Sequence, residues 1–291
     1  MFKPKKMFGQ NFLIDGNVVA KIVRVAGLSI NDEVWEIGAG KGVLTAELLK
    51  TGCSLTCFEI DRDLITLLRK QFGQEITLIA EDVLKADWDK IFQRMREKKE
   101  DNPKVTIVAN IPYYITSPLL YKITDYAQYF AKIIIMLQRE FAERLTAKPG
   151  SKSYGVMSLR IQYFFEVQKV FRVPRHLFRP EPAVDSEVVK LVPREKREQF
   201  TEPDLFWKLI ETAFHSRRKT LKNNLSTILS KEELQTLSGL IAIHSSDEKH
   251  ETVITLDKPL KFDLRDRGES LDEKDFINLY RLVRHARKLN N

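Results

Sequence analysis

The segment Asn110-Ile111-Pro112-Tyr113 places polar and aromatic groups on a stiff corner of the chain. It follows the apolar, β-branched run 105–109, which is typical of a strand buried on both faces. Pro112 has no N–H and keeps Ile111 extended, so the chain must turn at the carboxyl end of that strand, where open α/β sheets bind ligands. The Asn110 amide oxygen and the Ile111 carbonyl can accept two N–H groups, and Tyr113 can stack on a ring. The expected ligand is therefore a flat base with an exocyclic amine.

A glycine-rich loop, residues 38–42, follows the expected strand 34–37. It is not a phosphate-binding P-loop, because Gly42 follows Lys41 where Ser or Thr is needed and Trp35 stands where that motif begins with glycine. The dinucleotide fingerprint G-x-G-x-x-G also fails at its third glycine, which is Val43. The loop alone thus leaves its ligand open.

Three acidic residues narrow the choice of ligand. Glu59 ends the second expected strand, where a carboxylate can accept both ribose hydroxyls. Asp82 ends the third and could accept from an adenine amine, while Glu36 directly precedes the glycine loop. Such a set would repel a pyrophosphate and tolerate a cationic ligand. S-adenosylmethionine combines an adenosine, an amino-acid tail and a sulfonium, so it is the predicted cofactor.

The order of the elements predicts an α/β protein with a doubly wound parallel sheet. Expected strands 34–37, 55–59, 76–80, 105–109 and 133–137 alternate with helical stretches, the first of them capped by Asp15. Two later strands, 165–171 and 186–192, could close the sheet as an antiparallel hairpin. Beyond a charged linker the pattern becomes helical, at 204–214, 220–229, 231–237 and 273–287. The predicted division is a catalytic domain at 1–195 and a helical domain at 201–291.

Composition favours a polyanionic partner and a chain that is not embedded in a membrane. The net charge is +8 and the pI is near 9.3. No apolar run approaches ~20 residues, no signal-like segment opens the chain, and the two cysteines lack zinc spacing, so we expect a cytoplasmic protein with no metal. Basic residues form three clusters, which suggest contact with RNA: Lys3, Lys5 and Lys6; Arg217, Arg218, Lys219 and Lys222; and Arg281, Arg284, Arg287 and Lys288.

With these motifs in place, the sequence resembles the ribosomal RNA adenine-N6 dimethyltransferases, most closely their small-subunit branch. The likeness is collinear over almost the whole chain. Its motifs are FGQNFL (8–13), EIGAGKGVLT (36–45), EID (59–61), EDVL (81–84), NIPYYITSPLL (110–120), MLQREFAERL (136–145), YGVMS (154–158), FRPEPAVDSEVV (178–189), AFHSRRKTLKNNL (213–225) and RGESLDEKDFINLY (267–280).

The resemblance implies a Rossmann-like, class I S-adenosylmethionine-dependent methyltransferase sheet with a smaller C-terminal helical domain. It implies that the cofactor is bound by Asn11, Leu13, Gly38, Glu59, Asp82, Val83 and Asn110. The catalytic corner would be Asn110, Ile111, Pro112 and Tyr113. Substrate contacts would come from Tyr113, from Phe178 on the other face of the base, and from Arg217, Arg218, Lys219 and Lys222 on RNA phosphates.

The implied substrate is two adjacent adenines near the 3′ end of 16S rRNA within the 30S subunit, each methylated twice at N6 during ribosome biogenesis. Two features depart from the family pattern. Ile111 replaces a more frequent Leu, which is expected to be neutral because the backbone carbonyl acts there. The segment 241–265 is longer than the usual link, so the resemblance does not predict its local fold.

Three other functions share parts of this pattern. The large-subunit adenine methyltransferase that confers macrolide resistance has the same pocket motifs but a different helical domain, so AFHSRRKTLKNNL disfavours it. A non-catalytic RNA-binding factor on the same fold would not need Glu59, Asp82 and the 110–113 corner together. A DNA adenine methyltransferase can share an Asn-Pro-Tyr type of corner, but no DNA-reading domain is recognisable in this chain.

Overall fold

A computed structural model describes residues 10–98, 104–245, 254–256 and 259–290. The basic cluster at Lys3, Lys5 and Lys6 lies outside these residues, as does part of the 241–265 segment. The chain divides into two compact units. The sheet unit consists of Met1–Thr146 and Phe164–Arg194, and the helical unit consists of Ala147–Tyr163 and Glu195–Asn291.

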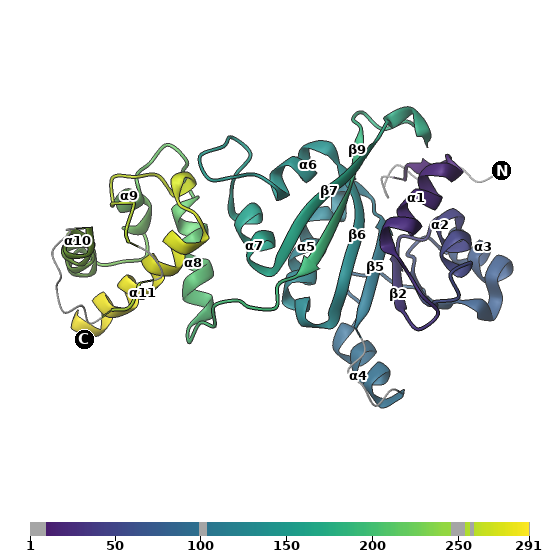
Figure 1. Cartoon of the computed structure of the whole chain (residues 1–291), viewed down its shortest axis with the longest axis horizontal. Helices are drawn as coiled ribbons and strands as arrows, with labels where there is room; N and C mark the ends of the chain where they lie inside the picture. Colours follow the sequence, from purple (N-terminus) through teal and green to yellow (C-terminus); the bar gives the residue numbers. More distant parts are fainter. Residues whose placement is uncertain (1–9, 99–103, 246–253, 257–258, 291) are drawn as a thin grey trace. The chain divides into compact units, whose positions relative to one another are not determined.

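The sheet unit confirms the predicted fold class. Its first five paired strands run parallel, whereas β9 is antiparallel to both of its neighbours, so the two late strands do close the sheet (Figure 1). In order of pairing, the strands are β4 (Thr77–Ile79), β3 (Ser54–Phe58), β2 (Glu33–Ile37), β5 (Val105–Asn110), β6 (Phe130–Gln138), β9 (Ser186–Pro193) and β7 (Phe165–Val173). The strand order reverses between β2 and β5, which is where such sheets open a ligand crevice.

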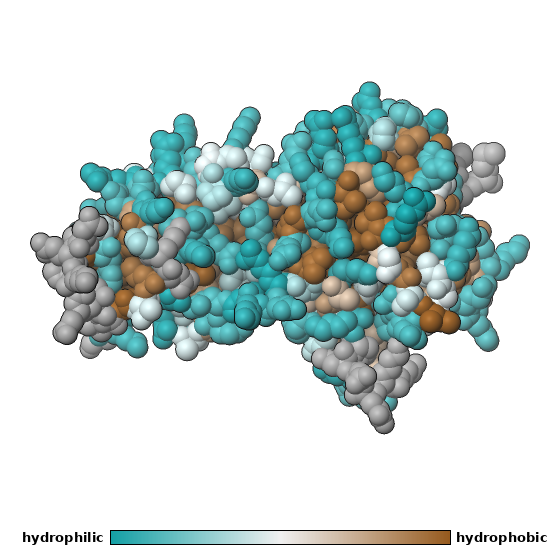
Figure 2. Space-filling model, in the orientation of Figure 1, coloured by the Kyte–Doolittle hydropathy of each residue, from teal (hydrophilic) through white to brown (hydrophobic). Residues whose placement is uncertain are grey.

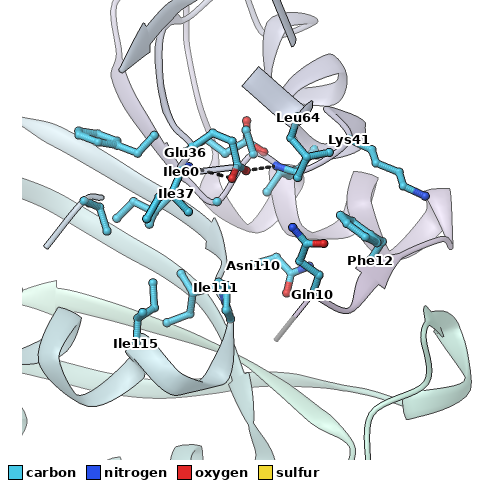
Figure 3. Close-up of a pocket in the computed structure, with 18 of the residues that line it drawn as sticks. Gln10, Phe12, Glu36, Ile37, Lys41, Ile60, Leu64, Asn110, Ile111 and Ile115 are labelled. Carbon is cyan, nitrogen blue, oxygen red and sulfur yellow. Dashed lines mark hydrogen bonds between the residues drawn. The ribbon is translucent and has the colours of Figure 1, made fainter. Parts of the chain in front are cut away.

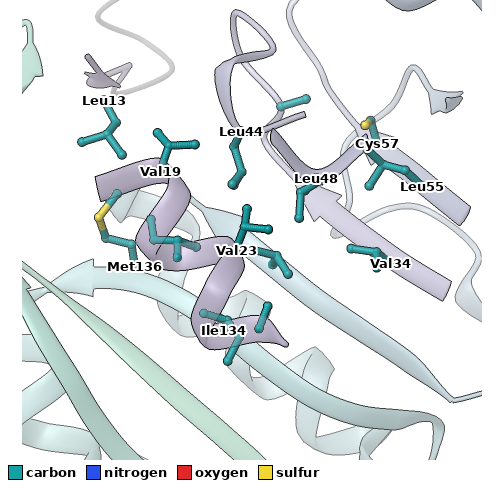
Figure 4. Close-up of a cluster of buried hydrophobic side chains, with 14 of the residues drawn as sticks. Leu13, Val19, Val23, Val34, Leu44, Leu48, Leu55, Cys57, Ile134 and Met136 are labelled. Atoms are coloured by element: carbon teal, nitrogen blue, oxygen red, sulfur yellow. The ribbon is translucent and has the colours of Figure 1, made fainter. Parts of the chain in front are cut away.

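Side chains alternate between the two faces of the sheet, as the period of a strand requires. Val34 of β2 packs in an aliphatic cluster under three helices (Figure 4): α1 (Gly16–Ala26), α2 (Val43–Leu49) and α3 (Arg62–Phe72). Trp35 points the other way and packs against Phe58, Trp88, Phe92 and Phe130, with ring centroids 4.9–6.2 Å apart. The remaining α-helices that belong to this unit are α4 (Trp88–Lys98), α5 (Thr116–Asp125) and α6 (Arg139–Leu145).

Local signals set the ends of several elements. The Asp15 carboxylate accepts the Val18 N–H at 2.9 Å and begins α1, as predicted. A second, two-stranded sheet pairs β1 (Phe12–Leu13) with β8 (Phe178–Arg179). Short 3-10 turns complete the described structure: η2 (Gly73–Glu75), η3 (Tyr113–Ile115), η4 (Ala127–Tyr129), η5 (Arg175–Leu177) and η6 (Gly268–Ser270).

The helical unit corrects the predicted domain boundary, because residues 147–163 pack with it. The Tyr154 hydroxyl donates to the Leu271 carbonyl at 2.9 Å, and the Gly150 N–H donates to the Glu269 carbonyl at 2.7 Å. The ring of Tyr163 lies against Trp207. The helices of the unit are α7 (Val156–Phe164, which ends at the boundary), α8 (Pro203–Ala213), α9 (Leu221–Leu225), α10 (Lys231–Ser245) and α11 (Glu273–Asn290).

Two helices of this unit differ from their predicted lengths. The helix predicted at 220–229 is helical only over α9, although Thr220 caps its N-terminus, and α10 continues to Ser245 rather than ending at residue 237. Hydrophilic residues predominate on the face of this unit drawn in Figure 2. In the described part of the chain, no helix is both long enough and apolar enough to cross a membrane.

Candidate active site

A cavity of about 1170 Å³, open to solvent, lies at the carboxyl ends of the parallel strands (Figure 3). Ten predicted site residues line it together, and they come from five separate segments of the chain. They are Asn11, Leu13, Gly38, Glu59, Asp82, Val83, Asn110, Ile111, Pro112 and Tyr113. The structure thus brings together every predicted cofactor and corner residue.

Glycines let the loop after β2 approach the Asn110 corner. Gly38 has a φ of +74°, and a Cβ there would lie 3.6 Å from Pro112 Cδ and 3.7 Å from the Asn110 carbonyl oxygen. Gly42 has a φ of +78°, and a Cβ there would collide with the Phe72 ring at 2.5 Å. Both positions therefore require glycine, and the loop presents backbone rather than side chains to the cavity.

Glu59 holds this loop in place. Its Oε2 accepts the Gly40 N–H at 2.9 Å, and its Oε1 accepts the N–H groups of Ile60 and Asp61, each at 2.9 Å. The side chain is only 6% exposed. Sequence reasoning had assigned Glu59 to a ribose alone and missed its bonds to the backbone of the glycine loop. Each carboxylate oxygen has two lone pairs, so Oε1 is fully used and Oε2 can accept one further donor, such as a ligand hydroxyl.

Asp82 organises the turn after β4. Its Oδ1 accepts the Leu84 N–H at 2.9 Å, and its backbone carbonyl accepts the N–H groups of Lys85 and Ala86 at 2.8 and 2.9 Å. Within the described part of the chain its Oδ2 makes no hydrogen bond or ion pair and is half-buried at the cavity. Val83, the next residue, is 5% exposed and contributes apolar surface to the same wall.

Asn110 and Tyr113 occupy the opposite wall. Asn110 ends β5 and is half-buried, so its amide is accessible to a ligand rather than enclosed in the core. The Tyr113 hydroxyl forms a hydrogen bond of 2.9 Å with Ser186 Oγ at the start of β9, which fixes the ring. Burial raises the pKa of Tyr113, so this hydroxyl stays protonated at neutral pH.

Glu36 forms part of the floor and is 1% exposed. Its Oε2 accepts from the Thr45 hydroxyl at 2.6 Å and from the Cys57 thiol at 3.5 Å. Desolvation by burial raises the pKa of Glu36 to about 8, and the charge of Glu59 adds to this shift. At neutral pH Glu36 is therefore mostly a neutral acid.

Five predicted site residues do not line this cavity. Phe178 is 1% exposed because it pairs with Leu13 through the β1–β8 sheet and packs in the hydrophobic core, and its contact with a bound base stays a prediction. The other four are exposed residues of the helical unit: Arg217, Arg218, Lys219 and Lys222. Among them Arg217 already has partners, because its guanidinium binds Glu269 Oε2 at 2.6 Å and the Lys152 carbonyl at 2.6 Å.

Sequence reasoning missed several lining residues. Ile60 and Tyr114 are exposed at the cavity, by 41% and 56%, although each directly follows a predicted site residue. Gln10 and Phe12 also contribute, and Gln10 Nε2 donates to Asp61 Oδ2 at 2.9 Å. Adjacency to Glu59, Tyr113 and Asn11 was the available signal for these residues.

Comparison with known proteins identifies the fold and the family. A family model described as ribosomal RNA adenine dimethylase matches residues 1–254. The chain belongs to this family. It is 38% identical over 281 residues to the ribosomal RNA small subunit methyltransferase A of Bacillus mycoides, covering 96% of this chain and 90% of that one. The Bacillus cereus protein of the same name matches with the same identity and coverage.

Two solved structures share the fold. A dimethyladenosine transferase from Plasmodium falciparum is 27% identical, with a TM-score of 0.70 over 92% of this chain and 95% of that one. The 23S rRNA methyltransferase ErmE has a TM-score of 0.64 over 94% of this chain and 100% of that one, and at 22% identity it shows the fold alone. The chain is thus an S-adenosylmethionine-dependent ribosomal RNA adenine dimethyltransferase with the predicted class I fold.

The donor set of the cavity fits this cofactor. Two carboxylates, Glu59 and Asp82, face it without an ion pair in the described part of the chain, which favours a cationic ligand that carries hydroxyl and amine donors. The absence of a Cβ at Gly38 leaves room between the loop and the corner. The Gly40 N–H of the glycine loop, which could otherwise face a phosphate, binds the Glu59 carboxylate.

Proposed function

We propose that this dimethyltransferase acts on two adjacent adenines near the 3′ end of 16S rRNA, within the 30S subunit and in the cytoplasm. The relatives named for the small subunit support this choice, because their similarity extends over 96% of the chain. The observation that carries the catalytic part is the half-buried Asn110 amide, which lines the same cavity as Gly38 and the two carboxylates.

The cofactor would lie between the glycine loop and the turn at Asp82. S-adenosylmethionine supplies an electrophilic methyl group on a sulfonium. Glu59 Oε2 would accept a ribose hydroxyl, and Asp82 Oδ2 would accept the adenine amine while Val83 frames the ring. Gly38 would allow the methionine portion to approach the backbone, with Asn11 and Leu13 on the far side of the cavity.

The target adenine would enter at the corner. The Asn110 amide oxygen and the Ile111 carbonyl would accept its two amine N–H groups, which favours a pyramidal nitrogen whose lone pair points at the methyl carbon. Alignment of this kind can supply most of the acceleration. The ring of Tyr113, held through Ser186, would stack on the base, which contributes about 1–3 kcal/mol.

Proton removal needs no dedicated base in this proposal. None of the described residues that line the cavity is a histidine, and the amine proton can leave after the methyl group has been transferred. The monomethyl product must then re-align in the same corner for the second transfer. Arg217, Arg218, Lys219 and Lys222 are proposed to contact RNA phosphates, and the target base must be unstacked to reach the corner.

Labelled methyl transfer tests the proposal directly. Unmodified small subunits, large-subunit RNA and duplex DNA are offered in parallel, and the methylated positions are mapped. The expected result is N6,N6-dimethyladenine at two adjacent positions of 16S rRNA only. Methylation of large-subunit RNA in preference to small subunits would contradict the proposed substrate, although the adenine chemistry would stand.

A further inference from the structure

Lys122 makes an unusually complete set of contacts with the turn that carries Asp82. Its Nζ donates to the carbonyl oxygens of Val83, Leu84 and Ala86 at 3.1, 2.9 and 2.7 Å. It also lies 4.7 Å from the centroid of the Trp88 ring, within cation–π range. An ammonium group has three N–H donors, and here each has a carbonyl acceptor.

These contacts join two parts of the cavity that are distant in sequence. Lys122 belongs to α5, which begins at Thr116, directly after the η3 turn of the catalytic corner. Buried residues fix this helix in the sheet unit, since Leu119, Leu120 and Ile123 are each 0% exposed. The ammonium therefore connects a helix anchored at the Asn110 corner to the wall formed by Asp82 and Val83.

The turn has few other restraints on its carbonyl side. The Asp82 carboxylate and carbonyl bind the N–H groups of residues 84–86, which curls the turn but does not attach it to the rest of the unit. The carbonyls of Val83, Leu84 and Ala86 converge on Lys122 alone among the side chains in the described part of the chain. Without that ammonium, three half-buried carbonyls would lose their partner and the turn could shift.

We propose that Lys122 is a positioning residue that holds the adenine-binding wall at Asp82 and Val83 in register with the catalytic corner. This inference rests on the cofactor placement made under the proposed function. Because a hydrogen bond weakens steeply when its geometry changes, a shift of the turn would reduce recognition of the adenine amine by Asp82. The rest of the cofactor site, at Glu59 and Gly38, would be unaffected.

The test compares two ligands that differ only at the C6–N1 edge of the purine, where the amine of adenine is replaced by a carbonyl and N1 carries a hydrogen. The dissociation constants of S-adenosylhomocysteine and S-inosylhomocysteine are measured by calorimetry without RNA. Wild-type protein is expected to prefer the adenosyl ligand. Lys122→Met, which keeps the aliphatic stem and removes the donors, should weaken adenosyl binding by about tenfold and leave inosyl binding nearly unchanged, so the preference falls by the same factor.

Two further variants separate positioning from folding. Lys85→Met makes the same change at an exposed lysine of the same turn that has no recorded side-chain partner, and it should keep the wild-type preference. Lys122→Arg retains the charge, but a planar guanidinium cannot direct three donors at converging carbonyls, so it should also lose preference while remaining folded. It serves as the readout if Lys122→Met does not fold.

The outcomes are distinguishable. A wild-type preference that both Lys122 variants retain, or an equal loss of affinity for both ligands, would overturn the role of Lys122 and leave the proposed function intact. Equal binding of the two ligands by wild-type protein would overturn the adenine placement and the inference with it. Failure to methylate small subunits would contradict only the proposed substrate, because these measurements contain no RNA.

Discussion

The carboxylates at the cavity and the glutamates that face α11 differ in their partners: backbone N–H groups at the cavity and arginine side chains at α11. At the cavity, Glu59 and Asp82 accept backbone N–H groups and have no ion pair within the described part of the chain. Along α11, three arginines each bind a glutamate at 2.7–3.0 Å: Arg281 with Glu198, Arg284 with Glu202 and Arg287 with Glu233. The first arrangement keeps negative charge available to a ligand, and the second neutralises it within the protein.

This difference shows that a charged side chain can be proposed to bind a ligand only after its partners within the protein are known. The sequence suggested that the basic cluster at 281–288 contacts RNA, and the structure shows that glutamates of the same unit already pair with its three arginines. Arg218, Lys219 and Lys222 are exposed and have no recorded ion pair in the described structure. They are the better candidates for phosphate contacts.

The largest effect is expected at the corner. Asn110→Ala should lower the rate of methyl transfer by at least about 100-fold, because the target amine loses an acceptor that aligns it. Affinity for S-adenosylhomocysteine should change only a few fold, since Glu59 and Asp82 remain. Single-turnover methylation and calorimetry measure the two quantities.

Asn31→Ala is a matched control for that experiment. Asn31 is exposed in the turn before β2, at the opposite edge of the sheet from the cavity, so its loss should leave both quantities unchanged. Near-normal turnover by Asn110→Ala would refute the assigned role of the amide.

A smaller effect should separate the two kinds of basic residue. Replacing Arg218, Lys219 and Lys222 together by Ala should weaken RNA binding by about tenfold and flatten its dependence on salt, because fewer counterions are released. Arg284→Ala should instead cost less than about 1 kcal/mol of stability, as exposed ion pairs do, and leave the salt slope unchanged.

Filter binding over a range of salt concentrations and thermal unfolding supply these readouts. Cofactor affinity should vary little with salt, because its contacts lie within the cavity. A salt slope that falls for Arg284→Ala and stays constant for the triple variant would reverse the assignment.

The cavity could be predicted from sequence because strand ends are local features. Glu59, Asp82 and Asn110 each follow a short apolar run, and parallel pairing necessarily brings such ends to one edge of the sheet. Partners that are remote in sequence could not be predicted in this way. The glutamates that pair with the arginines of α11 lie 54–83 residues from them in sequence. Lys122 lies 36–39 residues from the carbonyls that it binds.

Phe178 illustrates the same limit in the core. An aromatic residue two positions before a proline is equally compatible with an exposed platform and with a buried anchor. Its burial follows from the pairing of β8 with β1, two strands of two residues each that no periodic pattern could reveal. The residue therefore supports Leu13, which does line the cavity, from behind.

A pH-dependent effect is expected at Glu36, the carboxyl of the cavity floor whose burial raises its pKa to about 8 from an ordinary 4.5. Between these pH values the folded protein binds a proton that the unfolded chain has released. The associated stability is therefore complete below about pH 4.5 and is lost as the pH rises through 8. Glu36→Gln, which resembles the neutral acid, should remove this dependence.

Urea unfolding from pH 5.5 to 8 measures the difference between the two proteins. Wild-type stability should fall relative to Glu36→Gln by about 1 kcal/mol per pH unit across this range, since one pKa unit corresponds to about 1.4 kcal/mol. If the free energies of unfolding of the two proteins change with pH in parallel, Glu36 is ionised in the folded state. The cavity would then contain no neutral buried carboxyl to contrast with the ion-paired glutamates at α11.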